Sequence, residues 1–409
     1  MREKLRKAYP WIVVGLLSVV AFLNYLDRQM LSTMQTAIGA DITQLQEARN
    51  FGRLMAIFLW IYAIVSPFAG SIADRLSRKW LIVGSLGVWS LVTLLMGYCQ
   101  TFTQMYWLRG LMGVSEALYI PSSLSLIADY HAGKSRSLAV GLHMTGLYLG
   151  QAVGGFGAIF ASALSWRTTF HWFGLIGVAY AVVLMFCLRE KREARPAAAE
   201  ATGVPAAGEL LKSFGLIFSN IAFWVILFFF ASTSLPGWAT KNWLPTLFSQ
   251  HIDGGMAVAG PVATITIALA SFIGVMVGGP LSDRWVKKNL RGRIYTSAIG
   301  LGMMIPALVL MGLGHGVVSA VASGLIFGLG YGMFDTNNMP ILCQFVPSRL
   351  RATAYGLMNM VGVAMGALCT QLLGKIPNLG LSFALLGGVT ALALVLQLTV
   401  LRPTTDDMQ

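Results

Sequence analysis

Residues 70–79 read GSIADRLSRK and residues 279–288 read GPLSDRWVKK, so the pattern Gly-x-x-x-Asp-Arg-x-x-(Arg/Lys)-Lys occurs twice. The copies are 209 residues apart, about half of the 409-residue chain. Each copy follows one long apolar stretch and precedes another. A polar motif repeated between apolar spans indicates two similar membrane halves, an organisation on which many transporters are built.

The composition excludes a water-soluble protein. Hydrophobic residues make up 56% of the chain and charged residues only 11%, and the mean hydropathy is +0.69. Because soluble domains carry about 25% charged residues, we expect lipid to be the solvent for most of this chain. The four cysteines form neither a CxxC pair nor a metal-ligand spacing, so we interpret them as small apolar packing residues. We expect no metal site and no cofactor.

Twelve apolar segments are long enough for membrane-spanning helices, which need about 20 residues. They cover residues 11–37, 52–73, 80–99, 103–128, 137–162, 167–188, 214–239, 258–281, 294–313, 317–343, 351–374 and 378–401. The charged and then Ala/Pro/Gly-rich stretch 189–212 is the predicted cytoplasmic linker between an N-terminal bundle (1–188) and a C-terminal bundle (213–409). We therefore expect an all-α membrane protein with two pseudo-symmetric six-helix bundles.

The positions of lysine and arginine predict the orientation in the membrane. With a cytoplasmic N-terminus, 22 of the 29 lysines and arginines fall in cytoplasmic segments and two inside spans. The five on the opposite side are Arg49, Arg53, Arg167, Lys241 and Lys375. This bias follows the positive-inside rule, so we expect both termini in the cytoplasm. It also explains the net charge of +13 without a nucleic-acid partner.

A second repeated pattern, Arg-x4-Gly followed by two further glycines, supports the similarity of the two halves. Arg136-x4-Gly141 opens the fifth predicted span, and Arg351-x4-Gly356 opens the eleventh. The glycines that follow also correspond within one residue, Gly146 and Gly150 in the first half with Gly362 and Gly366 in the second. Two matching pairs at corresponding positions favour duplication over coincidence.

These features resemble the major facilitator superfamily over essentially the whole chain. NYLDRQ at residues 24–29 and RGLMGVSEALYIPSS at residues 109–123 resemble the anion:cation symporters, which include bacterial sugar-acid transporters and sialin-like carriers. Similar Asp-Arg and span-four Glu features occur in Spinster-like transporters. The resemblance implies alternating access by two six-helix bundles around a midplane site.

Charged residues away from the ends of the predicted spans are costly there and usually functional. The clear cases are Asp27, Arg28, Arg109 and Glu116, and Asp335 is a fifth, weaker case. Arg109 and Glu116 are seven residues apart and share a helix face. Asp27 and Arg28 are adjacent, roughly 100° apart, so they can serve different partners. Because the first four charges sum to zero, we expect a mutually compensated cluster in the N-terminal bundle.

The chemistry of this cluster suggests proton coupling. Low dielectric favours a neutral carboxyl group and a nearby arginine favours the charged form, so Asp27 and Glu116 are candidate proton carriers, with Arg109 modulating Glu116. Arg28 offers a planar fork that fits a substrate carboxylate. The resemblance to the sugar-acid symporters implies these roles at matching positions. The alternative is a permanent salt-bridge network that holds the helices together.

The repeated loop motif predicts conformational latches at the cytoplasmic ends, because its charges can bridge neighbouring helices. The residues are Gly70, Asp74, Arg75, Arg78, Asp283 and Arg284. The alternative role is topology anchoring by the cations alone. His143 and Asp335 are further gate candidates, with packing as the alternative for His143 and substrate contact as the alternative for Asp335.

Polar side chains in the spans are candidates for binding a hydroxylated substrate: Tyr25, Tyr62, Tyr148, Gln151, Asn338 and Asn359. Tyr62, Gln151 and Asn359 fall near positions that contact sugar acid in the resembled group. Hydrogen bonding between helices is the alternative for each.

The leading hypothesis is a proton-coupled symporter of a small organic anion, a sugar acid such as a hexuronate, aldonate or sialic acid, powered by the proton gradient. The alternative is a Spinster-like, proton-linked exporter of lysolipid or another amphiphile, for which a nearly uncharged second half leaves room. The sequence has no P-loop, HExxH or GxSxG, so we do not expect an enzyme. We expect a monomer in the bacterial inner membrane, with anion, protons and lipid as its partners.

Overall fold

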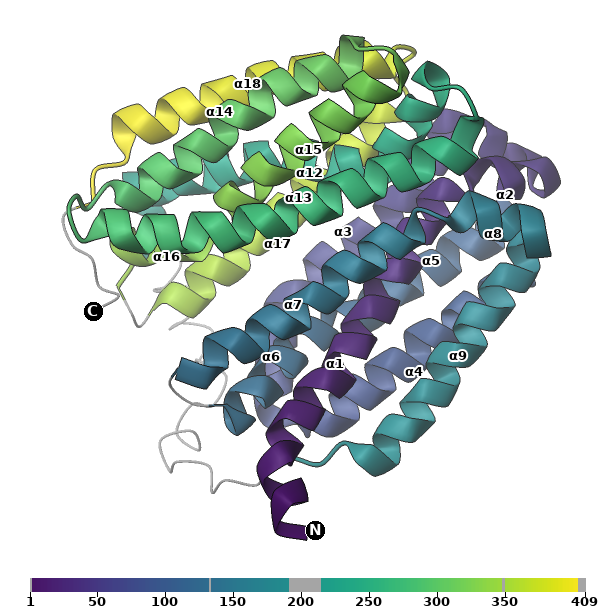
Figure 1. Ribbon diagram of the computed structural model, residues 1–409, viewed down its shortest axis with the longest axis horizontal. Helices are drawn as coiled ribbons and strands as arrows, with labels where there is room; N and C mark the ends of the chain where they lie inside the picture. The colour runs from purple at the N-terminus through teal and green to yellow at the C-terminus, as the bar shows by residue number, and fades with distance from the viewer. Residues whose placement is uncertain (1, 132–133, 191–214, 348–349, 404–409) are drawn as a thin grey trace. The chain divides into compact units, whose positions relative to one another are not determined.

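The computed structural model describes residues 2–131, 134–190, 215–347 and 350–403, and within these residues the chain forms helices and no strand (Figure 1). Eleven segments of this part are long and apolar enough to cross a membrane, or twelve if the bent pair α7 (Lys134–Gly154) and α8 (Gly157–Leu164) forms one span. The expected all-α membrane fold is confirmed.

The described helices group into two compact units. Unit 1 comprises Met1–Gln46 and Trp60–Ala206, and unit 2 comprises Glu47–Leu59 and Ala207–Gln409. The boundary therefore falls inside one helix, α3 (Ala48–Arg75), whose first turns belong to unit 2 and whose remainder belongs to unit 1. The bundle and linker boundaries expected from the sequence stay a prediction, since residues 191–214 of the linker region lie outside the described residues.

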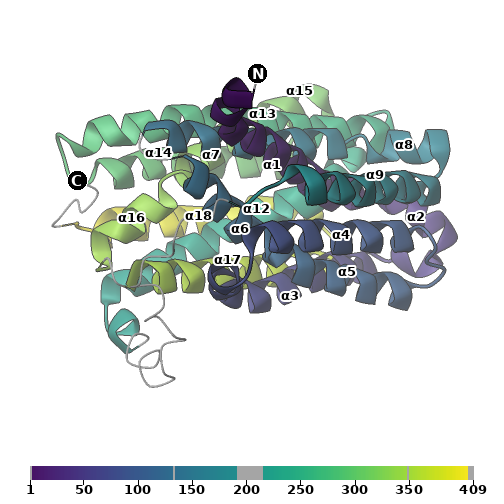
Figure 2. The ribbon, with the colours of Figure 1, turned by 90° about the horizontal axis from the view of Figure 1, so that it is seen from below.

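Unit 1 is built around α1, which packs along α7 (Figures 1 and 2). Its helices are α1 Arg2–Thr33, α2 Gln35–Asp41, η1 Thr43–Gln46, α3 Ala48–Arg75, α4 Arg78–Met96, α5 Phe102–Ala117, α6 Tyr119–Tyr130, α7 Lys134–Gly154, α8 Gly157–Leu164 and α9 Trp166–Cys187. Helices α5 and α6 together form one span, Phe102–Tyr130. Helix α5 starts at a capping box in which the side chains of Thr101 and Gln104 satisfy backbone amides reciprocally.

Unit 2 repeats this plan around α12, which packs along α17. Its helices are α12 Ile221–His251, α13 Gly255–Val286, α14 Gly292–Leu313, α15 Gly316–Asp335, α16 Asn338–Phe345, α17 Arg351–Leu373 and α18 Leu379–Val400. Figure 1 shows α14 and α18 side by side, and α15 packs against both α13 and α14. The long α12 is capped at its N-terminus by Asn220, whose side chain accepts a hydrogen bond from the backbone amide of Ala222.

The repeated glycines allow another helix to pack closely against the first long helix of each unit, α1 or α12. In unit 1, a Cβ added at Gly146 or Gly150 of α7 would overlap the carbonyl oxygen of Ser18 or Phe22 of α1. In unit 2, a Cβ at Gly362 or Gly366 of α17 would overlap the ring of Phe230 or Trp238 of α12. Small residues of this spacing let membrane helices approach closely. The correspondence read from the sequence is therefore a shared packing device, α7 on α1 and α17 on α12.

The structure corrects the position of Lys241. The sequence placed it outside the membrane, after a span ending at residue 239, but α12 continues as one helix to His251 and the whole segment qualifies as a span. In the sequence this part of the helix looks like the end of an apolar run, because it contains Lys241, Asn242 and Pro245. Membrane helices tolerate such prolines because neighbouring groups satisfy the freed backbone. The second half of the chain thus carries a cation inside its bundle.

Candidate functional site

An ion pair between α1 and α5 forms the centre of the candidate site in unit 1. The Nε of Arg28 donates to Oε2 of Glu116 at 2.5 Å. The Glu116 side chain is fully buried and that of Arg28 is 11% exposed. A buried pair of this kind requires that each charge keep its partner, because leaving one charge unpaired costs about 3–5 kcal/mol in soluble proteins.

The neighbouring charges complete the cluster. Thr93 of α4 donates its hydroxyl to Oδ2 of Asp27 at 3.1 Å. Arg109, on α5 two turns before Glu116, is 2% exposed and interacts electrostatically with both Glu116 and Asp27. Asp27 turns toward α4 while Arg28 turns toward α5, so the expectation that these adjacent residues serve different partners is confirmed. The proton-carrying and anchoring roles of these residues stay predictions.

Aromatic rings hold the guanidinium of Arg28. Its Cζ lies 5.1 Å from the ring centroid of Tyr25 and 5.2 Å from that of Tyr62. A ring face attracts a cation without neutralising it. Two of the predicted lining tyrosines therefore position the group predicted to bind the substrate carboxylate.

The other predicted lining residues are distributed over three helices. Tyr148 and the buried Gln151 lie on α7, the helix that packs along α1. In unit 2, Asn338 on α16 donates to Oδ1 of Asp335 at 3.1 Å, and Asn359 lies on α17. Their substrate contacts stay predictions.

Asn24 belongs to the same part of α1 and was not among the predicted site residues. It is fully buried, and both atoms of its side-chain amide lack a hydrogen-bond partner among the described residues. Burying an amide without partners is costly, so this position suits contact with a polar ligand or water. The sequence alone could have identified Asn24, because it is a polar residue within an apolar run, one helical turn before Arg28.

The first copy of the loop motif makes contacts that the sequence did not predict. Nη1 of Arg78 donates to Oδ2 of Asp129 at the end of α6. Glu190, just after α9, accepts hydrogen bonds from the Ser77 hydroxyl at 2.6 Å and from the Arg78 amide at 2.9 Å. The side chains of the predicted latch residues Gly70, Asp74 and Arg75 lie outside the described residues.

The second copy joins α13 to α14. Nη1 of Arg293, which is 4% exposed, donates to Oδ1 of Asp283 at 3.4 Å. Arg284 is exposed at the end of α13. In both copies a motif charge thus pairs with a residue of another helix, as a latch requires, although the partners Asp129 and Arg293 could not be identified by spacing alone. The gating roles stay predictions.

His143 is enclosed within unit 1. It is fully buried, its Nε2 lies 3.4 Å from the Ser123 hydroxyl of α6, and its ring centroid lies 6.0 Å from that of Tyr119. These contacts suit the packing alternative for His143, and its gating role stays untested.

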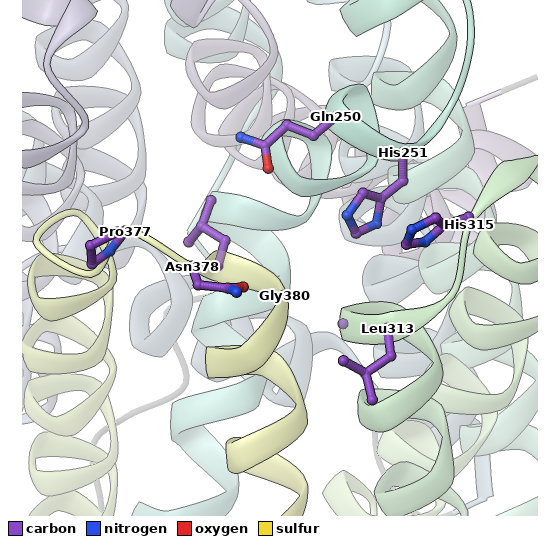
Figure 3. A pocket seen from close by; sticks show the side chains of 9 residues that line it. Gln250, His251, Leu313, His315, Pro377, Asn378 and Gly380 are labelled. Carbon is purple, nitrogen blue, oxygen red and sulfur yellow. The ribbon is translucent and has the colours of Figure 1, made fainter.

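Unit 2 has a cavity of about 380 Å³ where α12 and α14 end and α15 and α18 begin. Figure 3 shows its polar side chains, Gln250, His251, His315 and Asn378. The rings of His251 and His315 stack with centroids 4.9 Å apart. Among the described residues, no group of three or more His, Cys, Asp or Glu could hold a metal ion.

Comparison with known proteins identifies the family. The family described as Major Facilitator Superfamily matches residues 17–370. This chain belongs to the major facilitator superfamily. It is therefore a multi-pass membrane transporter and not an enzyme.

Relatives within this superfamily have several different functions. The chain is 25% identical to the probable galactarate/D-glucarate transporter GudP of Escherichia coli (strain K12), over 98% of this chain and 94% of the relative. It is 26% identical to protein spinster homolog 1 of Xenopus laevis, over 87% of this chain and 70% of the relative. A crystal structure of a bacterial homologue of the human lysosomal transporter Spinster, inward-facing and occupied, shares the fold with a TM-score of 0.77 and 18% identity, over 96% of both chains.

Proposed function

We propose that this facilitator is a proton-coupled symporter of a sugar acid or a similar small organic anion. The single observation that carries the proposal is the buried pair of Arg28 and Glu116, framed by Tyr25 and Tyr62. The pair offers both functions that symport needs in one place: a guanidinium for the anion and a carboxyl group for the proton.

Competition for Arg28 would link the two. A substrate carboxylate that binds the guanidinium displaces Glu116 from it, because both anions use the same donors. A carboxyl group that has lost its cation in a buried site favours its neutral form and takes up a proton. Anion and proton then load together, and either one alone leaves an uncompensated buried charge.

Asp27 and Arg109 would tune this exchange. Asp27, held by Thr93, is a second buried carboxyl group in the same electrostatic field as Glu116. Arg109 supplies a further positive charge to both carboxyl groups. With the proton gradient as the energy source, the proposal requires no cofactor. It places a monomer in a bacterial inner membrane, with both termini in the cytoplasm.

Export of a lysolipid or another amphiphile is the second candidate, supported by the similarity to spinster homolog 1. Such a substrate needs an apolar surface for its acyl chain. Unit 2 instead carries Lys241, Asp335 and Asn338 on its interior helices, which favours a polar substrate.

Uptake into liposomes containing the purified protein tests the choice. We would impose a pH gradient, acidic outside, and measure entry of labelled aldonate, hexuronate, aldarate and lysophospholipid, with empty liposomes as the control. Gradient-dependent uptake of at least one sugar acid is the expected result. Transport of lysophospholipid with none of the acids would reject the proposal in favour of the second candidate.

A further inference from the structure

Glu116 has no direct access to water. Its side chain is fully buried, and that of Asp27, the other carboxyl group of the cluster, is only slightly exposed. Oε2 of Glu116 accepts a hydrogen bond from Arg28, whereas Oε1 has no hydrogen-bond partner among the described residues. A proton that binds to this carboxyl group or leaves it must therefore pass through buried neighbours, and Oε1 is the atom that can receive it.

Asn24 lies on α1 beside both carboxyl groups. Four residues after it, Arg28 pairs with Glu116 of α5, and three residues after it, Asp27 accepts a hydrogen bond from Thr93 of α4. At about 100° per residue, the direction of Asn24 falls between those of Asp27 and Arg28. The amide of Asn24 therefore points between α4 and α5, into the interior of unit 1, where it is fully buried.

Trp89 faces the same interior from α4. It lies one turn before Thr93 and so shares the face of α4 that contacts α1. Its ring centroid lies 5.5 Å from that of Tyr119, which follows Glu116 by three residues along the span formed by α5 and α6. The Tyr119 hydroxyl in turn donates to the carbonyl oxygen of Leu17 in α1 at 2.8 Å. These contacts enclose Trp89 between α1, α4 and the α5–α6 span.

The polar atoms that point into this interior form a mixed set. Nδ2 and Oδ1 of Asn24, Nε1 of Trp89 and Oε1 of Glu116 are buried, and none of them has a hydrogen-bond partner among the described residues. Two of the four are donors and two are acceptors. Water both donates and accepts, and buried waters typically make about three hydrogen bonds to polar groups that would otherwise be unpaired. The set therefore suits bound water better than an ion of either sign.

We propose that Asn24 and Trp89 bind internal water in unit 1 and that this water carries protons between Asp27 and Glu116. This inference rests on the proposed function, in which Glu116 takes up a proton when the anion displaces it from Arg28. The water oxygen accepts the proton of the Asp27 carboxyl group while one proton of the water passes to Oε1 of Glu116. One O–H bond forms for each that breaks, so the water is regenerated, and release follows the same steps in reverse. Asn24 and Trp89 are positioning residues, because they act through the water.

A purely structural role for these two residues makes different predictions. If Asn24 binds no water, replacing it with leucine, which has a similar size and shape, removes an unpaired polar group, and this change is neutral or stabilising and leaves transport unchanged. If Trp89 only packs against Tyr119, Trp89→Phe keeps an aromatic ring in that place and loses only the Nε1 donor. A packing defect, in contrast, would slow every transport step and not the proton step alone.

The experiment compares two rates in liposomes, using a sugar acid that the wild-type protein transports. Net uptake under a pH gradient, acidic outside, requires Glu116 to gain and lose a proton in every cycle. Exchange of labelled for unlabelled acid at equal pH allows the proton to stay bound. The variants are Asn24→Leu, Asn24→Ser and Trp89→Phe, with the exposed Trp107→Phe of α5 as a matched tryptophan control. Thermal unfolding of each purified variant shows whether it is folded.

We expect the ratio of net uptake to exchange to fall about tenfold or more in Asn24→Leu and Trp89→Phe, because a positioned proton-transfer group contributes about 100-fold or more. Asn24→Ser keeps a polar group and leaves room for water, so it should recover much of the ratio, and Trp107→Phe should keep the wild-type ratio.

A wild-type ratio in either folded variant, Asn24→Leu or Trp89→Phe, would overturn the inference, whether both rates are unchanged or fall together. If Asn24→Leu does not fold, Trp89→Phe alone decides. A wild-type protein that takes up no sugar acid, or takes it up without protons, would instead overturn the proposed function, and this inference with it.

Discussion

Replacing Arg28 with lysine separates the charge of this residue from the shape of its guanidinium group. The ammonium keeps the positive charge next to Glu116, so the buried carboxylate still has a counter-ion. It loses the planar fork, which can donate two parallel hydrogen bonds to one carboxylate. The variant therefore tests whether Arg28 binds the anion through directed hydrogen bonds or only balances charge.

The expected effect follows from the contacts of Arg28. Its Nε reaches Oε2 of Glu116 at 2.5 Å, and its Cζ lies 5.1 Å from the ring centroid of Tyr25 and 5.2 Å from that of Tyr62. A substrate that takes the place of Glu116 would lose one of two charge-assisted hydrogen bonds in the variant, a loss of about 1.5–3 kcal/mol. At about 1.4 kcal/mol per tenfold, KM should rise about 10- to 150-fold.

The assay is the initial rate of uptake against substrate concentration under a fixed pH gradient. Arg402→Lys, an exposed position after α18, is the matched control and should leave KM unchanged. A folded Arg28→Lys variant whose KM stays within threefold of wild type would refute the reasoning, because the anion would then need only a positive charge at this site.

Three further predictions follow from the packing, the latch and the loops. Gly150→Leu should lower the melting temperature by several degrees, because the new side chain would collide with the backbone of α1. Gly84 faces open space, so Gly84→Leu should leave the melting temperature unchanged. Thermal unfolding in detergent measures both variants. Arg78→Asp should slow uptake by repelling Asp129, and adding Asp129→Arg should restore part of the rate; a double variant no faster than the single one would contradict the pairing. Burial raises the pKa of the Cys99 thiol to about 11, against the opposing effect of Arg167. Because maleimide reacts with the thiolate, it should label Cys99 roughly 100-fold more slowly at pH 8 than it labels an ordinary thiol. The labelling rate should increase as the pH rises toward 11.

The sequence predicted the architecture because its signals were local and repeated. The two motif copies and the glycines Gly150 and Gly366 each recur at about half the chain length, and both glycines pack in the corresponding place of their unit. Apolar length then identified the spans. The sequence did not predict where helices break, as after Thr33 in the first predicted span or between α7 and α8. It also placed the end of α12 too early, because a lysine and a nearby proline, here Lys241 and Pro245, are typical of the end of a span.

The candidate site was harder to predict because its pairings join different helices. Helical spacing related Glu116 to Arg109 on the same face of α5, but the direct partner of Glu116 is Arg28 of α1. The same limit hid Asp129 as the partner of Arg78. A single sequence gives positions along one helix, and the contacts between helices depend on rotations and register that packing alone decides.

Proton movement driven by the substrate tests the central claim, that one buried pair couples anion to proton. Liposomes with a pH-sensitive dye inside would receive the best sugar acid of the uptake panel, with wild type and Glu116→Gln compared at equal amounts of folded protein. We predict that adding the sugar acid acidifies the interior of liposomes that contain the wild-type protein, because protons enter with the anion. Glu116→Gln should exchange labelled for unlabelled acid without moving protons. Equal acidification by the variant, or uptake by wild type without acidification, would contradict the account.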